Sequence, residues 1–204
     1  MIRLPRLYPI LSLACFASRD ELFSAAEELV AVGCTLLQYR NKSAHPCQML
    51  DDAQELKRRI GNSANLVMND RADLAIAAGF NGVHLGQDDL PPEDARRVIG
   101  TELWLGFSTH NPEQVLAADK TSADYIAIGP VFATASKDRP DPVIGLEGVR
   151  HARELTRKPL VAIGGITREN CRMVIEAGAD SVAVISGLLP DPRKSAGDFF
   201  RILG

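Results

Sequence analysis

The chain has 204 residues, of which 46% are hydrophobic and 24% charged, the ordinary composition of a soluble globular protein. Domains typically hold roughly 100–200 residues, so a single domain over residues 1–204 is expected. The 23 basic and 26 acidic residues give a net charge of -3. This balance leaves no broad positive surface for nucleic acid or an anionic membrane, and neither is expected as a partner.

The cysteines and the N-terminus indicate a cytoplasmic location. The four cysteines have no CxxC pair and no zinc-binding spacing, so free thiols are the simpler interpretation. Arg3 and Arg6 precede an apolar stretch over 7–16, which superficially resembles a signal peptide. A first core strand is favoured instead, because a capped helix follows at once. No apolar run approaches the ~20 residues of a membrane span.

Short apolar runs alternate with amphipathic segments along the whole chain. The predicted strands cover residues 7–11, 35–39, 65–68, 82–85, 103–107, 125–128, 160–163 and 181–185. The first predicted helix opens on a capping box at 18–21 and ends at Gly33. The other predicted helices cover 46–60, 72–78, 92–99, 112–118, 147–156, 168–177 and 198–203.

Eight strands alternating with eight helices in about 200 residues predict a closed (β/α)8 TIM barrel. Ala-Gly pairs at 78–79 and 177–178 each join a helix end to a strand, which is a weak sign of an internal repeat. The same pairs could also be ordinary helix stops.

Polar residues gather immediately after the strands, where TIM barrels build their active sites. Each group also has a simpler explanation: Arg40 and Lys42 as a solvated pair, Asp70 as a helix cap, and Asp88-Asp89 as a turn. Only a shared barrel mouth accounts for all of them together. We expect the mouth to combine the cations Arg40, Lys42 and Lys137 with the carboxylates Asp70 and Asp89.

Two phosphate sites are expected at this mouth. Glycines at 164–165 and Ser186-Gly187 follow the last two strands, where barrels often bind phosphate through backbone N–H groups. The mixed charge cluster suits a magnesium diphosphate, because Mg²⁺ takes one or two carboxylates and shares phosphate oxygens. Two phosphorylated small-molecule substrates favour a transferase with diphosphate as leaving group.

Several segments resemble the thiamine-phosphate synthase family. They are QYRNK at 38–42, VMNDRAD at 67–73, GVHLGQDDL at 82–90, GFSTH at 106–110, DYIAIGPVF at 124–132 with TASK at 134–137, and the glycine pair at 164–165. They cover nearly the whole chain in order. The resemblance implies a TIM-barrel enzyme that joins an aminopyrimidine methyl diphosphate to a thiazole phosphate, giving thiamine monophosphate and diphosphate.

The resemblance also implies roles for individual residues. Asp70 and Asp89 would ligate Mg²⁺. The pyrimidine diphosphate would be bound by Gln38, Arg40, Lys42, Asn69, Ser108 and Lys137, with Tyr39 and Asn41 in the same segment. The thiazole phosphate would be bound by Thr134, Ala135, Ser136, Gly165, Ile185 and Ser186. Arg40, Lys42, Ser108 and Lys137 would be the catalytic set.

This chain departs from the family pattern at a few positions. Tyr39 and Asn41 replace an aliphatic and an acidic residue, Ser136 stands where Thr is frequent, and Ser12 stands near a frequent Asp. Two other functions stay open: a thiazole tautomerase on the same barrel, with a base such as His110, and a non-catalytic sensor of thiamine precursors. The sequence leaves open the oligomeric state, including a homo-oligomer, and whether the thiazole carries a carboxylate.

Overall fold

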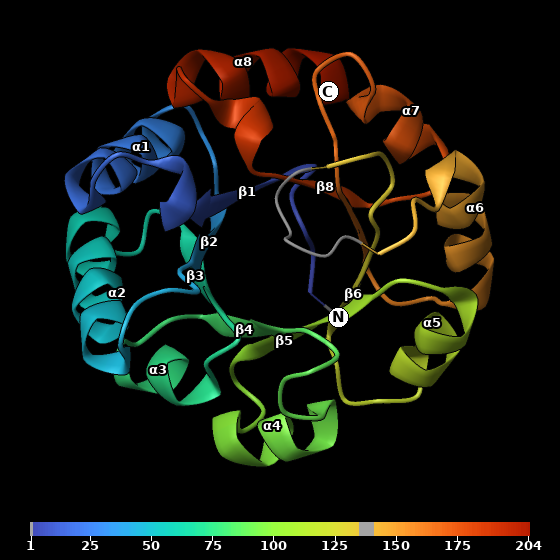
Figure 1. Cartoon of the computed structure of the whole chain (residues 1–204), viewed down its shortest axis with the longest axis horizontal. Coiled ribbons are helices and arrows are strands. Elements are labelled where there is room, and N and C mark those ends of the chain that lie inside the picture. The colour runs from blue at the N-terminus through green and yellow to red at the C-terminus, as the bar shows by residue number, and fades with distance from the viewer. Residues whose placement is uncertain (1, 135–140) are drawn as a thin grey trace.

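In the described part of the chain, eight parallel strands pair in chain order, and the last pairs with the first to close a barrel (Figure 1). The computed structural model describes residues 2–134 and 141–204. The strands are β1 (Leu7–Ser12), β2 (Leu36–Arg40), β3 (Asn65–Asn69), β4 (Gly82–Leu85), β5 (Trp104–Thr109), β6 (Tyr125–Ile128), β7 (Leu160–Ile163) and β8 (Ser181–Val184). The predicted (β/α)8 barrel is therefore confirmed.

A ring of helices surrounds the strands. The helices are α1 (Arg19–Ala31), α2 (Pro46–Ile60), α3 (Ala72–Ala77), α4 (Pro92–Ile99), α5 (Pro112–Asp119), α6 (Gly145–Leu155), α7 (Cys171–Glu176) and α8 (Pro192–Leu203), with 3-10 turns η1 (Leu13–Cys15) and η2 (Ser186–Leu188). The predicted capping box begins α1: Ser18 accepts a hydrogen bond from the Glu21 backbone, and Glu21 accepts one from the Ala17 backbone.

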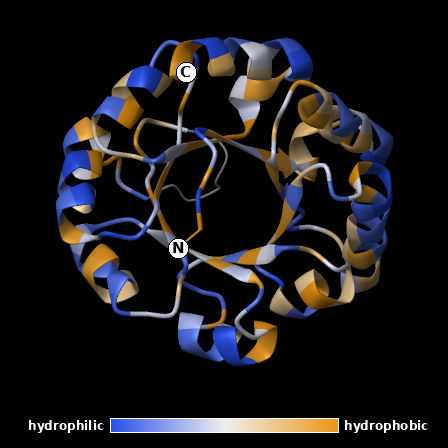
Figure 2. Ribbon diagram, turned by 180° about the vertical axis from the view of Figure 1, so that it is seen from behind, coloured by the Kyte–Doolittle hydropathy of each residue, from blue (hydrophilic) through white to orange (hydrophobic). Residues whose placement is uncertain are grey.

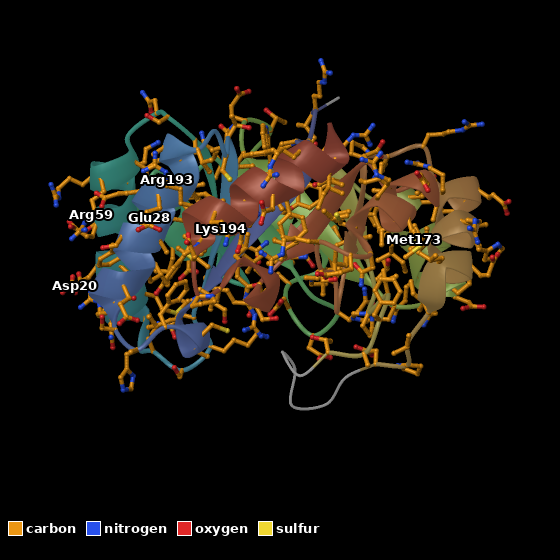
Figure 3. All side chains as sticks on the ribbon, turned by 90° about the horizontal axis from the view of Figure 1, so that it is seen from above. Asp20, Glu28, Arg59, Met173, Arg193 and Lys194 are labelled. Atoms are coloured by element: carbon orange, nitrogen blue, oxygen red, sulfur yellow. The ribbon has the colours of Figure 1, made fainter. Side chains whose placement is uncertain are left out.

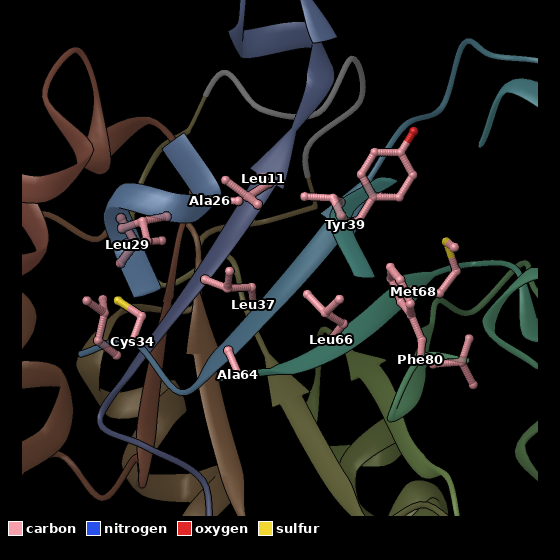
Figure 4. Packing of buried hydrophobic residues seen from close by; sticks show 14 of the residues in the cluster. Leu11, Ala26, Leu29, Cys34, Leu37, Tyr39, Ala64, Leu66, Met68 and Phe80 are labelled. Carbon is pink, nitrogen blue, oxygen red and sulfur yellow. The ribbon is translucent and has the colours of Figure 1, made fainter. Parts of the chain in front are cut away.

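Side chains along each strand alternate between the barrel interior and the helical layer. Tyr8, Val67 and Tyr125 belong to the interior cluster. Leu37 and Leu66, one position along their strands, pack outward with the helices (Figure 4). This alternation decides which residues of a strand can reach the barrel mouth.

Hydrophobic residues are frequent on the strands and on the helix sides that face them, while hydrophilic residues are frequent on the outer sides of the helices (Figure 2). Figure 3 shows charged side chains such as Asp20, Glu28 and Lys194 projecting from the outer helices. In the described part of the chain, no helix combines the length and apolarity that crossing a membrane requires. The four cysteines are free thiols, as expected.

The largest difference from the predicted elements is at the C-terminal helix. We expected a short helix over 198–203, but α8 begins at Pro192. Asp191 caps it by accepting a hydrogen bond from the Lys194 backbone, and Pro192 occupies the first turn, where its missing N–H costs nothing. Helix α7 is shorter than the predicted 168–177. The Asn170 side-chain oxygen accepts a hydrogen bond from the Thr167 backbone N–H ahead of the helix, and the helix begins only after Asn170.

Gly197, inside α8, is a position where alanine should stabilise the protein. A Cβ there would meet only the Val32 side chain, at 3.8 Å, which is an ordinary contact. Glycine in a helix interior costs about 0.5–1 kcal/mol relative to alanine. We expect Gly197→Ala to raise the free energy of unfolding by about that amount in urea denaturation. A lower free energy of unfolding would contradict this description of α8.

Candidate functional site

The candidate site lies at the carboxyl ends of the barrel strands. Arg40 closes β2 on the same face of the strand as the inward-pointing Gln38, and its Nη1 donates to Ser12 Oγ at the end of β1 over 3.0 Å. Its guanidinium is thus fixed at the mouth by the neighbouring strand. Lys42 follows in the same loop and places Nζ 3.2 Å from Asp70 Oδ2, beyond β3.

Two carboxylates meet next to Lys42. Asp89 Oδ2 accepts a 2.7 Å hydrogen bond from the Gly86 backbone in the loop after β4. Burial and the negative charge of the nearby Asp70 carboxyl raise the pKa of Asp89. Two adjacent acidic groups beside Lys42 could hold a divalent cation.

The backbone at Asp70 supports a functional interpretation. Asp70 has φ of 66°, the only positive value at a non-glycine position among residues 2–134 and 141–204. Its N–H donates to the His84 carbonyl on β4 over 2.8 Å, which holds the residue against the neighbouring strand. Unusual backbone conformations of this kind concentrate at binding sites.

Three further residues predicted to bind the diphosphate, all in the described ranges, lie on the inner wall of the mouth. Gln38 and Asn69 are buried, near the ends of β2 and β3. Ser108, near the end of β5, has Oγ 2.9 Å from His84 Nε2. The structure therefore brings Gln38, Arg40, Lys42, Asn69 and Ser108 to the same end of the barrel as the two aspartates. Their contacts with substrate remain predictions.

Tyr39 and Asn41 bond with the helical layer in this structure, and their predicted part in substrate binding stays a prediction. Strand alternation turns Tyr39 outward, into the layer shared with Leu37 and Leu66 (Figure 4). Its hydroxyl donates to Asp52 of α2 over 2.5 Å and accepts from Asn41 Nδ2 over 3.2 Å. Burial and the Asp52 carboxylate raise the pKa of Tyr39. These two residues fasten β2 and its loop to the helical layer.

The expected thiazole phosphate site is built from neighbouring loops. A Cβ on Gly165, at φ 63°, would lie 2.5 Å from the Ala133 carbonyl oxygen, so this position requires glycine because of close packing with the loop after β6. A Cβ on Gly187 would lie 3.1 Å from the Ile166 carbonyl oxygen, which shows that the loops after β7 and β8 are also adjacent.

The remaining residues predicted to bind the thiazole phosphate are only partly described. Ile185 and Ser186 lie where β8 passes into η2, and Thr134 follows β6. Ala135 and Ser136 lie outside the described residues, as does Lys137, which was predicted to bind the diphosphate.

Sequence reasoning missed the buried polar residues beneath the mouth. Tyr8, His84 and Tyr125 are polar groups on strands, and they bond to one another or to predicted site residues. Burial lowers the pKa of His84 to about 4, so its ring is neutral at pH 7. Burial also raises the pKa of Tyr8 to about 12, and that of Tyr125 well above its usual value. The signal in the sequence that could have revealed these three residues is a polar side chain within an otherwise apolar strand.

Comparisons with known proteins agree with the geometry. The family model described as thiamine monophosphate synthase matches residues 7–188. A relative from Koribacter versatilis, named thiamine-phosphate synthase, is 60% identical over 205 residues, covering 99% of this chain and 97% of the relative. A relative of that name from Chlorobium phaeovibrioides is 41% identical over 197 residues, covering 93% of each chain.

A solved structure has the same fold and a related sequence. The thiamine phosphate pyrophosphorylase from Pyrococcus furiosus superposes with a TM-score of 0.85 at 35% identity, covering 97% of this chain and 95% of that chain. Together with the family match and the two relatives, it leaves one assignment: this chain belongs to the thiamine monophosphate synthase family.

Proposed function

We propose that this chain is a thiamine-phosphate synthase. It transfers the 4-amino-2-methylpyrimidin-5-ylmethyl group from its diphosphate to the nitrogen of a 4-methyl-5-(2-phosphoethyl)thiazole and releases diphosphate. With the 2-carboxy form of the thiazole, CO2 would be released as well. The observation that carries the proposal is the meeting of Lys42, Asp70 and Asp89 at the barrel mouth, where Arg40 also ends its strand. Membership of the thiamine monophosphate synthase family supports these substrates.

Mg²⁺ fits the residues present. Asp70 and Asp89 offer carboxylate oxygens side by side, and Mg²⁺ binds through one or two carboxylates plus water and substrate phosphate oxygens. No group of three or more acidic, histidine or cysteine ligands gathers anywhere in the described ranges. When bound, the ion would neutralise charge on the diphosphate.

The chain's own cations would act on the leaving group. The pyrimidine amino group donates electrons toward the exocyclic carbon, so the C–O bond can break ahead of attack by the thiazole nitrogen. Negative charge then grows on the diphosphate, where Arg40 and Lys42 are held by Ser12 and Asp70. Lys137, outside the described residues, is assigned the same task by resemblance. The attacking nitrogen carries no proton, so the step requires no general base.

Binding both substrates at one mouth would contribute through proximity. Gln38, Asn69 and Ser108 line the wall on the pyrimidine side, and the adjoining loops after β6, β7 and β8 would hold the thiazole phosphate.

The tautomerase alternative would need a base such as His110, whose Nδ1 lies 2.6 Å from the Gly129 carbonyl oxygen. The free cysteines favour a cytoplasmic enzyme.

Product analysis tests the proposed function. Purified protein is incubated with the pyrimidine diphosphate, the thiazole phosphate and Mg²⁺, and thiamine monophosphate and diphosphate are quantified by chromatography. We expect equimolar amounts of both, and loss of both with EDTA. Isomerisation of a carboxythiazole without diphosphate release would establish the tautomerase, and binding without product would establish the sensor.

Lys42→Met should weaken binding of the diphosphate substrate specifically. The variant keeps the length of the side chain but removes the charge 3.2 Å from Asp70. We expect the KM for the pyrimidine diphosphate to rise about tenfold, equivalent to ~1.4 kcal/mol, with an unchanged KM for the thiazole phosphate. Lys120→Met, at the C-terminus of α5, is the matched control and should change neither constant. Equal rises in the KM values for the two substrates would show that Lys42 does not bind the diphosphate specifically.

A further inference from the structure

A continuous chain of hydrogen bonds crosses the barrel interior and ends at two residues of the proposed site. We call it the interior relay, and it consists of Gln38, Tyr8, Tyr125, His84 and Ser108. The donor–acceptor distances are 2.9 Å from Gln38 Nε2 to Tyr8 Oη, 3.1 Å from Tyr8 Oη to Tyr125 Oη, 3.0 Å from Tyr125 Oη to His84 Nδ1, and 2.9 Å from His84 Nε2 to Ser108 Oγ.

The barrel leaves room for this relay at one glycine. Gly106 on β5 pairs with His84 of β4 on one side and Tyr125 of β6 on the other. A Cβ on Gly106 would lie 2.3 Å from Tyr125 Oη and 2.4 Å from His84 Nδ1. Only a residue without a side chain lets these two groups meet across β5. The contact thus depends on all three strands.

Burial restricts the direction of the hydrogen bonds. Tyr8, Tyr125 and Gln38 are at most 2% exposed, and a buried hydroxyl without a hydrogen-bond partner loses its hydration with nothing in return. Gln38 Nε2 can only donate, so Tyr8 accepts from it and passes its own hydrogen to Tyr125. Tyr125 then donates to His84 Nδ1, which must be unprotonated. The proton of the neutral ring therefore lies on Nε2.

The opposite direction leaves one group unsatisfied. If His84 Nδ1 carried the proton and donated to Tyr125, Tyr125 would donate to Tyr8, which already accepts from Gln38. The Tyr8 hydrogen would then have no partner in the relay. With Gln38 Nε2 facing Tyr8, only one direction satisfies every hydroxyl.

We propose that the interior relay holds His84 as the Nε2–H tautomer and thereby turns the Ser108 hydroxyl hydrogen toward the barrel mouth. His84 Nε2–H donates to Ser108 Oγ, so the Ser108 hydrogen is free to donate elsewhere. In the reverse direction the Ser108 hydroxyl would donate its hydrogen to His84 Nε2, and only its lone pairs would face the mouth. An anionic diphosphate needs donors, so the relay gives Ser108 the polarity that substrate requires. His84, Tyr125 and Tyr8 are positioning residues.

The tautomer of His84 can be measured without any substrate. Of the four histidines, His84 is identified by the signal lost in His84→Gln. We expect ¹⁵N NMR at pH 7 to show a protonated, pyrrole-type Nε2 and a pyridine-type Nδ1. A protonated Nδ1, or two tautomers in exchange, would overturn the proposal. In Tyr125→Phe, which removes the donor to Nδ1, we expect both tautomers. Tyr39→Phe, on the outer face of β2, is the matched control and should retain the Nε2–H form.

Kinetics test whether the relay acts through Ser108. This arm depends on the proposed function, and product formation by the wild-type enzyme tests that function separately. We expect Tyr125→Phe to lower kcat/KM for the pyrimidine diphosphate about tenfold in the wild-type background, and to have little further effect in Ser108→Ala. Independent, multiplying losses would show that Tyr125 acts by general stabilisation of the barrel and would overturn the positioning role.

Discussion

Asp89→Asn is expected to lower turnover at least 10²-fold, a loss of roughly 2.7 kcal/mol of transition-state stabilisation. The amide keeps the size of the side chain, and its oxygen can still accept from the Gly86 backbone. It loses the negative charge that, with Asp70, would bind the cation shared with the diphosphate. Single-turnover measurements with saturating substrates separate this effect from product release.

Two controls separate chemistry from folding in this experiment. Asp88→Asn changes the exposed neighbouring aspartate and should leave turnover within about twofold. Asp89→Asn also relieves repulsion between two adjacent carboxylates, so the metal-free variant should melt no lower than the wild type. Unchanged turnover in Asp89→Asn, or an equal loss of turnover in Asp88→Asn, would show that Asp89 is not a ligand of the proposed metal site.

Gly106→Ala is expected to destabilise the barrel severely. The added Cβ would lie 2.1 Å from Tyr125 Cζ and 2.4 Å from His84 Nδ1, with strands on both sides. Overpacking typically costs 1–3 kcal/mol, and we expect about 3 kcal/mol here. That corresponds to a melting temperature lower by about 6–12 °C in a chain of this size.

A double variant identifies the clash as the cause. Tyr125→Val removes the ring atoms that the new methyl group would strike. The double variant should therefore lose less stability than the sum of the losses in Tyr125→Val and Gly106→Ala. Gly197→Ala serves as the matched glycine substitution and should stabilise. A melting temperature unchanged in Gly106→Ala would mean that β4, β5 and β6 are not packed around the His84–Tyr125 contact as described.

Much of the fold followed from local signals. Glycine after each early helix and short apolar runs placed β4, β6 and β7 at the observed bounds, and proline starts placed α2 and α4. Helix α8 was predicted too short because its true start depends on the Asp191 cap and on Pro192, ahead of an interior glycine. Such a start is readable in sequence only when the cap is given more weight than the glycine.

The site was predicted at the level of the mouth and less well at the level of single side chains. Parallel strands bring Arg40, Asp70 and Asp89 to one end, which topology alone implies. Neighbours along a strand point to opposite faces, so Tyr39, between Gln38 and Arg40, has to face the helices, which its place in the shared sequence segment does not reveal. The interior relay joins residues up to 117 positions apart, and its contacts depend on register that sequence does not reveal.

The most direct test of the metal-bound diphosphate site is a crystal structure with Mg²⁺ and diphosphate. We predict one octahedral ion bound to carboxylate oxygens of Asp70 and Asp89 and to diphosphate oxygens, with Arg40 and Lys42 on the remaining phosphate oxygens. Diphosphate bound away from both aspartates, or an ion coordinated elsewhere on the protein, would contradict it.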